Sequence, residues 1–356
     1  MILRAESAHS EISNLNRVNS VKIFTLLLMA PLVYAAPALA NVTVTSPNIG
    51  AEVVSPFRLV ATASNCSSQP VSSMGYAIDN NTNWTIFQGP SINTTVSSIT
   101  GARTVHVKAW ARGGAVCEAF AAIIVVPDPT SLVPADALVF KRIQALKNWQ
   151  EAGDNAGSNG TAIGQTNLVF WPSLSGAARQ FVTKFTNYGD ERYWVVIGQN
   201  TAVTNFLYDG WVYVARPSST IGNIEFDMNQ VMSNGQTVIY GFQCDGYSGT
   251  WDYTANEGTP EAFSDQWLHS AFPCNPRNWS TNAWHHVQIT YSRDTYGTVT
   301  YQSVWFDGVE EDLNATVRSA FALGWGSVLL TNFQIDGYGS SGSSTVYLDN
   351  LTIYSW

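Results

Sequence analysis

Glu225, Asp227 and Asn229 stand at alternate positions in the segment 221–243, and Phe226 and Met228 separate them. A period of two places the three polar side chains on one face of a β-strand and the two apolar ones on the other. Carboxyl groups so placed can hydrogen-bond sugar hydroxyls, or can act as nucleophile and acid in cleaving a glycosidic bond. The Cα atoms of Glu225 and Asp227 would lie about 6.6 Å apart, near the ~5–5.5 Å between the carboxyl groups of retaining glycosidases. Acids on a strand face are also common on the solvated side of a sheet.

A tight turn must place this strand against its neighbour. Asn234-Gly235 is a strong short-range signal of a hairpin. The segment 237–242 that follows is β-branched and aromatic, as a returning strand should be.

Aromatic residues crowd the sequence around this strand. A β-sandwich formed by these strands cannot bury all of the aromatic side chains with their N–H and O–H groups satisfied, so we expect several to be exposed. Exposed rings among Asn, Gln and Asp are typical of surfaces that bind neutral polysaccharides by stacking and hydroxyl hydrogen bonds. The residues expected to contact such a glycan are Asn229, Gln230, Trp211, Tyr213, Tyr240, Trp251, Tyr253 and Trp267.

The composition limits the class of partner. The 356 residues are 45% hydrophobic and 12% charged, which is enough apolar material for one large or two medium cores. The formal net charge of −9 argues against nucleic acid and anionic membrane, because both need a basic face. We expect an extracellular polysaccharide as the partner.

Residues 1–40 have the features of a secretion signal. Arg17 and Lys22 precede the apolar run 23–36, and Ala38-Leu39-Ala40 gives a small-x-small cleavage site. The run is shorter than the ~20 residues that a membrane-spanning helix needs, and no later stretch is long enough to span a bilayer. We expect a secreted protein, extracellular or periplasmic, after cleavage near Ala40.

Export makes disulfides possible. The chain holds four cysteines, one pair in each half and none with the spacing of a zinc site. We expect the structural bridges Cys66–Cys117 and Cys244–Cys274.

The pattern predicts an all-β fold in two parts. Short strands with turn signals between them fill 41–127, which favours a β-sandwich. Residues 128–169 read as a linker with a short helix over 135–151, where apolar residues recur at helical spacing. The segment 170–356 again alternates without interleaved helices, which favours two packed antiparallel sheets in a jelly roll.

Two resemblances support this division. The first part, with GARTVHVKAWARGG at 101–114, resembles the immunoglobulin-like modules of secreted bacterial proteins. WHHVQITYSRD at 284–294, YQSVWFDGVEEDLN at 301–314 and TVYLDNLTIYSW at 345–356 resemble the closing half of a concanavalin A-like lectin/glucanase domain, over roughly residues 170–356. That group includes binders and enzymes, so the resemblance implies a fold and leaves the function open.

Family 16-type glucanases of this group carry two glutamates and an aspartate on one strand. By resemblance Glu225 is the nucleophile and Asp227 orients it. The acid/base position holds Asn229, or Gln230 if the strand is bulged, and neither amide can transfer the proton.

Four interpretations therefore remain. The strand could bind sugar without cleaving it, which is the leading one. Another acid could supply the proton in an endo-acting glycoside hydrolase, and the candidates are Asp209, Asp245, Asp252, Glu257 and Asp265. A polysaccharide lyase could recruit Tyr240, Gln243, His269, His285, His286 and Arg216. The chain could also be structural or adhesive.

We expect no cofactor, although domains of the group that the segment 170–356 resembles often hold a structural calcium ion at a sheet edge. Asp349, in the closing strand, is the expected ligand.

Overall fold

The computed structural model describes residues 42–79, 83–154 and 160–356, so the predicted signal peptide lies outside the described residues. Strands dominate the described chain, and their pairings are antiparallel except that of β2 with β9. The predicted all-β class is confirmed. No helix within the described ranges is long and apolar enough to cross a membrane.

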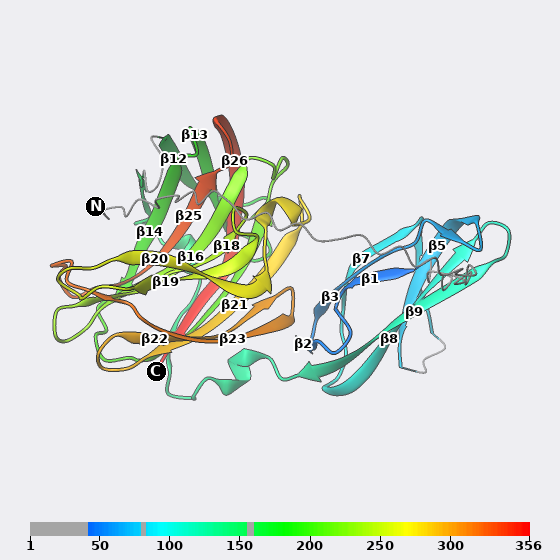
Figure 1. Ribbon diagram of the computed structural model, residues 1–356, viewed down its shortest axis with the longest axis horizontal. Helices are drawn as coiled ribbons and strands as arrows, with labels where there is room; N and C mark the ends of the chain where they lie inside the picture. Colours follow the sequence, from blue (N-terminus) through cyan, green and yellow to red (C-terminus); the bar gives the residue numbers. More distant parts are fainter. Residues whose placement is uncertain (1–41, 80–82, 155–159) are drawn as a thin grey trace, which may run out of the picture.

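The N-terminal unit is a β-sandwich of two sheets (Figure 1). One sheet has the order β1-β3-β7, and the other has the order β2-β9-β8-β5-β4 with β6 beside β5. Phe57, Leu59 and Val107 are among the buried residues between them. The strands are β1 (Thr43–Ser46), β2 (Glu52–Val54), β3 (Phe57–Thr62), β4 (Asn65–Cys66), β5 (Gln69–Ile78), β6 (Thr85–Gln88), β7 (Ser91–Val96), β8 (Gly101–Ala111) and β9 (Val116–Val126).

The C-terminal unit is a larger two-layer sandwich. Its first sheet has the order β12-β13-β26-β15-β21-β22-β23, with β10 beside β26. Its second has nine strands, in the order β11-β14-β25-β16-β18-β19-β20 with β17 and β24 at one side. The elements are η1 (Pro129–Leu132), β10 (Leu138–Phe140), η2 (Ile143–Ala145), β11 (Gln150–Gly153), β12 (Thr161–Val169), β13 (Ala178–Thr186), β14 (Asp190–Gly198), β15 (Asn205–Val214), β16 (Ile221–Val231), β17 (Thr237–Tyr240), β18 (Phe242–Asp245), β19 (Thr250–Asn256), β20 (Asp265–Pro273), η3 (Pro276–Asn278), β21 (Trp284–Arg293), β22 (Thr298–Phe306), β23 (Val309–Arg318), β24 (Ala320–Phe321), β25 (Leu329–Gly337) and β26 (Ser341–Ser355).

The core of the C-terminal unit lies between its two sheets. Ile224, Phe226 and Met228 project into it from β16, and Phe333 and Ile335 project from the neighbouring β25. Because side chains alternate along a strand, the residues between these project from the opposite face of the nine-stranded sheet.

The segment 135–151 corrects one prediction, because it forms no α-helix. Leu138–Phe140 pairs with β26 and Gln150–Gly153 pairs with β14, while Ile143–Ala145 is a single 3-10 turn. Main-chain pairing with the sandwich overrides the helical spacing of the apolar residues. Much of the predicted linker thus consists of edge strands of the C-terminal unit.

Both predicted disulfides are confirmed. Cys66 bonds Cys117 within the N-terminal unit, and Cys244 bonds Cys274 within the C-terminal unit. The predicted hairpin at Asn234-Gly235 also forms, with Gly235 at a φ of 83°. The returning strand is interrupted at Gly241, between β17 and β18. The side chain of Thr254 occupies the space where a Cβ of residue 241 would lie, so a glycine is required there.

The two units meet along one strand pair and around one cavity. Val53 of β2 pairs with Val309 of β23. Beside this contact lies a cavity of about 480 Å³, with Arg58 on one side and Trp279 and His285 on the other. His285 is held there by Asp307 at 2.8 Å and by the carbonyl of Ser280 at 3.0 Å.

Candidate functional site

The polar face of the nine-stranded sheet carries the candidate site. We use this name for the face that Asn223, Glu225, Asp227 and Asn229 share on β16. All four side chains are nearly buried, although they project away from the hydrophobic core. Buried polar groups need partners, and the strand register shows which residues supply them.

One row of polar side chains crosses the sheet through Glu225. Residues directly opposite one another on paired strands share a face and lie in contact. The row, here called the middle row, runs Arg192 (β14), Gln334 (β25), Glu225 (β16), Gln243 (β18), Asp252 (β19) and His269 (β20). Six strands thus contribute one polar group each, from positions far apart in the sequence.

Glu225 lies at the centre of this row. Its Oε1 accepts hydrogen bonds from Gln334 Nε2 at 2.9 Å and from Asn223 Nδ2 at 3.4 Å. Burial raises its pKa well above the ordinary value, and the neighbouring charges of Asp227 and Asp336 raise it further. This shift favours the protonated form of Glu225, in which the carboxyl group can donate as well as accept a hydrogen bond.

Asp227 and Asp336 lie on either side of the middle row. Burial raises the pKa of Asp227 to about 7, although the amide N–H of Phe242 donates to its Oδ1 at 3.0 Å and opposes the shift. Burial likewise raises the pKa of Asp336 to about 7. The polar face therefore gains negative charge as the pH rises through neutrality.

The nine-stranded sheet is curled, so its polar face is concave. Asp154 follows the edge strand β11 and Asp265 begins the strand β20 near the other end of the sheet order. The charge of Asp154 nevertheless acts on Asp265, whose pKa burial raises to about 6 and Asp154 raises further. Figure 1 shows β19 and β20 crossing the direction of β16 and β25. This curvature accounts for the burial of polar side chains that no hydrophobic layer covers.

Two partly exposed tryptophans face this concave surface from opposite sides. Trp194 on β14 pairs with Asn332, which in turn pairs with Asp227. Trp267 on β20 shares a strand face with Asp265 and His269. Arg192 lies over the ring of Trp194, with its guanidinium carbon 5.6 Å from the ring centre. Trp267 was predicted from the sequence, whereas Trp194 lies outside the segment around β16 and was missed.

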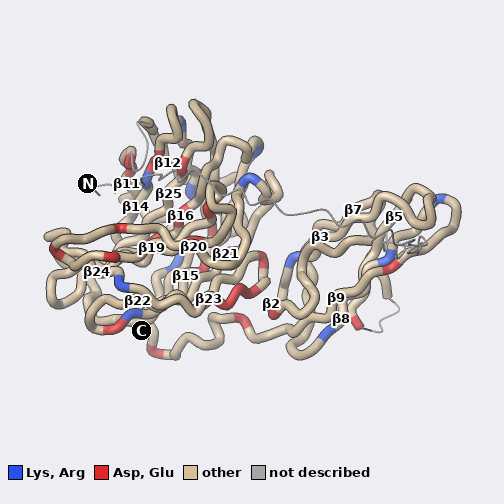
Figure 2. The backbone as a smooth tube through the Cα atoms, in the orientation of Figure 1, with Lys and Arg blue, Asp and Glu red and all other residues tan. Residues whose placement is uncertain are grey.

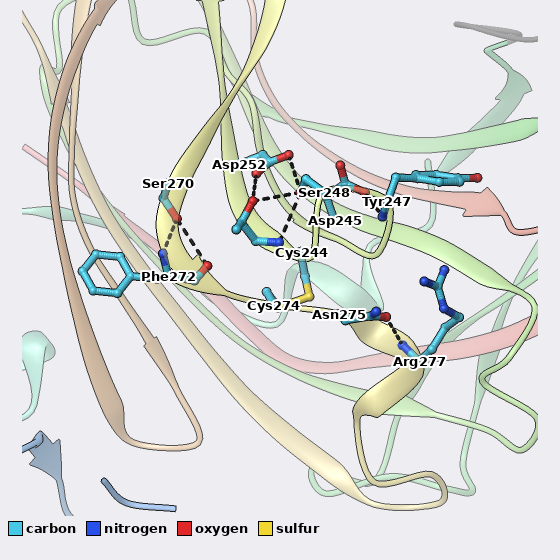
Figure 3. The surroundings of a disulfide bond; sticks show 11 residues. Cys244, Asp245, Tyr247, Ser248, Asp252, Ser270, Phe272, Cys274, Asn275 and Arg277 are labelled. Atoms are coloured by element: carbon cyan, nitrogen blue, oxygen red, sulfur yellow. Dashed lines mark hydrogen bonds between the residues drawn. A yellow bond between two sulfur atoms is a disulfide. The ribbon is translucent and has the colours of Figure 1, made fainter. Parts of the chain in front are cut away.

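Asp252 and His269 form a hydrogen-bonded pair at the β19–β20 side of the row. His269 Nδ1 lies 2.8 Å from Asp252 Oδ2. The Asp252 side chain is fully buried, and 61% of the His269 side chain is exposed. Ser248 also donates to Asp252, and Figure 3 shows this contact beside the Cys244–Cys274 disulfide. A buried carboxylate that orients an exposed imidazole is an arrangement that can serve as a base or as a hydrogen-bonding pair.

Three predicted contact residues lie instead on the core side. Trp251 is only 2% exposed and stacks on Phe242 at 5.4 Å. Tyr240 is buried and donates to Gln230, which also accepts from Arg293. These predictions are wrong because Trp251, Tyr240 and Gln230 occupy strand positions that face the other sheet.

Tyr253 lies on the same core side and is partly buried. Its ring centre is 5.2 Å from that of Tyr301, which belongs to the opposite sheet. It is therefore a packing residue, in contrast to the prediction.

Trp211 and Tyr213 lie on β15, in the other sheet of the sandwich. Trp211 stacks on His286 with the ring centres 4.4 Å apart, and Tyr213 packs against Trp284 and Tyr347. The prediction that they contact a glycan on the face of Glu225 is corrected, since β15 and β16 belong to opposite layers.

Asn229 keeps its predicted place on the polar face. The register of β16 with β25 is regular from Ile224 to Gln230, so no bulge moves Gln230 onto this face. The position that a glucanase fills with its second glutamate thus holds Asn229, whose Oδ1 is buried without a partner among the described residues.

Asp349 is a hydrogen-bond anchor rather than an open ligand. Ser173, Ser175 and the main-chain N–H groups of Leu174 and Ser175 donate to its carboxylate, as does Gln144. Burial alone would raise its pKa, but these donors lower it. The prediction of a calcium ligand is corrected, because protein donors already occupy both oxygens. In the described part of the chain, no three His, Cys, Asp or Glu residues are placed to hold a metal.

Charge is sparse on both units. Figure 2 shows acidic and basic residues scattered along the tube, with no continuous basic stripe over the described residues.

Comparison with known proteins finds neither a matching family model nor a matching curated protein. Among solved structures, one from a study of the promiscuous specificity of carbohydrate-binding modules of the β-sandwich superfamily aligns with 87% of this chain and 96% of its own, at 11% identity and a TM-score of 0.31. The structure of the cellulose induced protein Cip1 aligns with 58% of this chain and 90% of its own, at 14% identity and a TM-score of 0.34. The structure of lectin II from Ulex europaeus aligns with 62% of this chain and 98% of its own, at 12% identity and a TM-score of 0.34. These TM-scores are too low to establish a shared fold, so the assignment of function rests on the site.

Proposed function

We propose that the protein is an exported carbohydrate-binding protein whose concave polar face holds a neutral polysaccharide. The observation that carries this proposal is the position of Trp194 and Trp267 at opposite ends of the row next to the middle row, the row that contains Asn332 and Asp227. Tryptophan rings stack on the apolar faces of sugar rings, and the amide and carboxyl groups between them match sugar hydroxyls as donors and acceptors. Two disulfides fit an oxidising compartment, in line with the predicted signal peptide.

The acids of the polar face favour a neutral polymer over a uronate. Glu225, Asp227, Asp252, Asp265 and Asp336 share this face, and Arg192 is the basic side chain of its middle row. A bound carboxylate would add a negative charge to a poorly solvated face where burial already disfavours ionised acids, which is unfavourable. This argument also weighs against a polyuronate lyase.

Affinity electrophoresis tests the proposal. The chain would be run through gels that contain a soluble β-glucan, xylan, mannan or polygalacturonate. We expect at least one neutral polymer to retard the protein and polygalacturonate to have no effect. Retardation by the uronate alone, or by none of the polymers, would contradict the proposal.

Hydrolysis is a second candidate, favoured by the relation of Glu225 to Asp252. Burial and the neighbouring acids raise the pKa of Glu225, which suits the role of a general acid. Asp252, which pairs with His269, lies two strands away from Glu225. In a flat sheet the Cα atoms of Glu225 and Asp252 would be about 9.6 Å apart. Inverting glycosidases separate their carboxyl groups by ≈ 6.5–9.5 Å to admit water, and side chains on strands two places apart that lean toward one another bring their carboxyl groups closer than their Cα atoms.

Reducing-end release on the same polymers separates the two candidates. An inverting hydrolase should release reducing ends, and Glu225→Gln should abolish release while retaining binding. Binding without any release leaves recognition as the function. Release that persists in Glu225→Gln would exclude Glu225 as the acid.

A further inference from the structure

Three exposed tyrosines form a cluster, here called the tyrosine cluster, at one end of the polar face. Tyr188, Tyr247 and Tyr338 are 48%, 50% and 42% exposed. Their ring centres lie 6.4 Å, 6.4 Å and 5.6 Å apart. They come from three separate turns, those between β13 and β14, β18 and β19, and β25 and β26. Scattered exposed aromatics are ordinary, but three in contact form an unusual patch.

The backbone holds one of these rings in a position that tyrosine rarely adopts. Asn187 and Tyr188 have φ values of 48° and 63°, the left-handed conformation of a tight hairpin turn. Glycine or asparagine is the usual residue at such positions, and a bulky residue there is disfavoured. A strained residue that also exposes half of its ring suggests a role outside folding.

The tyrosine cluster is continuous with the polar face. Tyr247 lies over Gly222 of β16, where a Cβ atom would touch its ring. Gly222 is three residues, about 10 Å, from Glu225 along the same strand. Burial raises the pKa of Tyr247, and the charges of Asp336, Asp190 and Asp245 raise it further. These acids lie at the end of the polar face next to the tyrosine cluster. The polar face is therefore continuous with the three rings.

The cluster is suited to a neutral ring rather than to a cation. Three tyrosines beside acids could form an aromatic cage for an ammonium group. Arg277 already fills that role, because its guanidinium carbon lies 3.7 Å from the ring centre of Tyr338. Figure 3 shows the side chains of Arg277 and Tyr247 extending to the same side of the disulfide. The remaining exposed ring faces offer stacking surface.

We propose that the tyrosine cluster is an extension subsite, which stacks the next sugar units of the glycan that the polar face holds. The inference rests on the proposed function. A chain that lies along β16 between Trp194 and Trp267 reaches the cluster after passing Glu225 and Asn223. The rings are inclined to one another by 41° to 90°, so they suit a single flexible chain better than a flat crystalline surface.

Calorimetric titration with oligosaccharides of increasing length tests this subsite. The probes are β-linked gluco-, xylo- and manno-oligosaccharides, from disaccharide to hexasaccharide, titrated into the full chain. Wild-type affinity should rise with length until the cluster is filled. Tyr188→Gly should remove this gain and weaken binding of the longest probes about tenfold, while leaving the shortest unchanged. Glycine suits the left-handed backbone, so this variant should remain folded.

Two further variants make the result specific. Tyr338→Ala should behave as Tyr188→Gly does, and Tyr296→Ala, which removes an exposed tyrosine in the distant 294–297 turn, should bind as wild type. Unchanged length dependence in both cluster variants, with binding to short probes intact, would overturn the subsite and leave the proposed function standing. An equal loss for short and long probes would also overturn it. No binding of any probe by wild type would refute the proposed function itself.

Discussion

Raising the pH from about 5 to about 8 should destabilise the C-terminal unit, because its polar face holds buried carboxyl groups. Burial raises the pKa of Asp227 and Asp336 from 3.8 to about 7 and that of Glu225 well above 4.5. Below pH ~4 these groups are protonated in both the folded and the unfolded chain. Between pH ~4 and ~7 the unfolded chain releases the protons first, so the free energy of unfolding falls as the pH rises.

The magnitude follows from the pKa values. A carboxyl group with a pKa of about 7 instead of 3.8 costs roughly 4 kcal/mol to ionise in the folded state, and roughly 3 kcal/mol of this is lost between pH 5 and pH 8. Asp227, Asp336 and Glu225 share neighbours, so we take about 4 kcal/mol as the order of the combined loss rather than a sum. For a unit of this size that corresponds to a fall in Tm of roughly 10 °C.

Differential scanning calorimetry over this pH range measures the effect. The double variant Asp227→Asn, Asp336→Asn should lose most of the pH dependence, because two titrating groups are gone and Glu225 loses two negative neighbours. The matched control Asp136→Asn removes an exposed carboxyl group outside the site and should keep the wild-type profile. A wild-type Tm that is constant or rises between these pH values would refute the reasoning.

Other substitutions separate structural from binding roles. Trp251→Ala should lower the free energy of unfolding by about 3–5 kcal/mol, seen in urea titrations, because the indole is buried in the core; a change under ~1 kcal/mol would contradict its placement. Asp349→Ala should lower Tm, whereas a chelator should leave the wild-type Tm unchanged, since protein donors hold the carboxylate; a chelator-induced fall would restore the calcium hypothesis. Replacing Cys244 and Cys274 by Ser should cost about 3 kcal/mol, given the 30-residue separation; unchanged stability would contradict a structural bridge.

The residue pattern along the sequence was sufficient to predict β16, the strand at the centre of the candidate site. Alternation alone placed Glu225, Asp227 and Asn229 on one face, and Asn234-Gly235 marked the turn after it. Both properties depend on a few neighbouring residues, which is why the sequence reveals them.

The partners of Glu225 could not be predicted, because they come from strands whose order the sequence does not state. Gln334 lies more than one hundred residues later in the chain, and Arg192 belongs to a strand two places away in the sheet. Which aromatic side chains are exposed could not be predicted for the same reason, because exposure depends on the order of the strands. Trp251 pairs with Cys244 and therefore faces the core, whereas Trp267 takes a position on the polar face.

The error over 135–151 has a different cause. Apolar residues at helical spacing were present, but Leu138 and Val139 serve a three-residue edge strand and Trp149 packs on Phe181 in the core. Strands of three or four residues are too short to show a clear alternation of apolar and polar residues. The helical spacing of the apolar residues therefore dominated the prediction.

Calorimetric titration of Trp267→Ala beside Trp211→Ala tests the central claim most directly. Both variants remove a partly exposed tryptophan, one from the polar face and one from the outer side of the opposite sheet. With the neutral polysaccharide that retards the wild type, Trp267→Ala should bind at least about tenfold more weakly, and Trp211→Ala should bind as wild type does. Loss of binding in Trp211→Ala, with Trp267→Ala unaffected, would place the glycan on the other sheet and contradict the account.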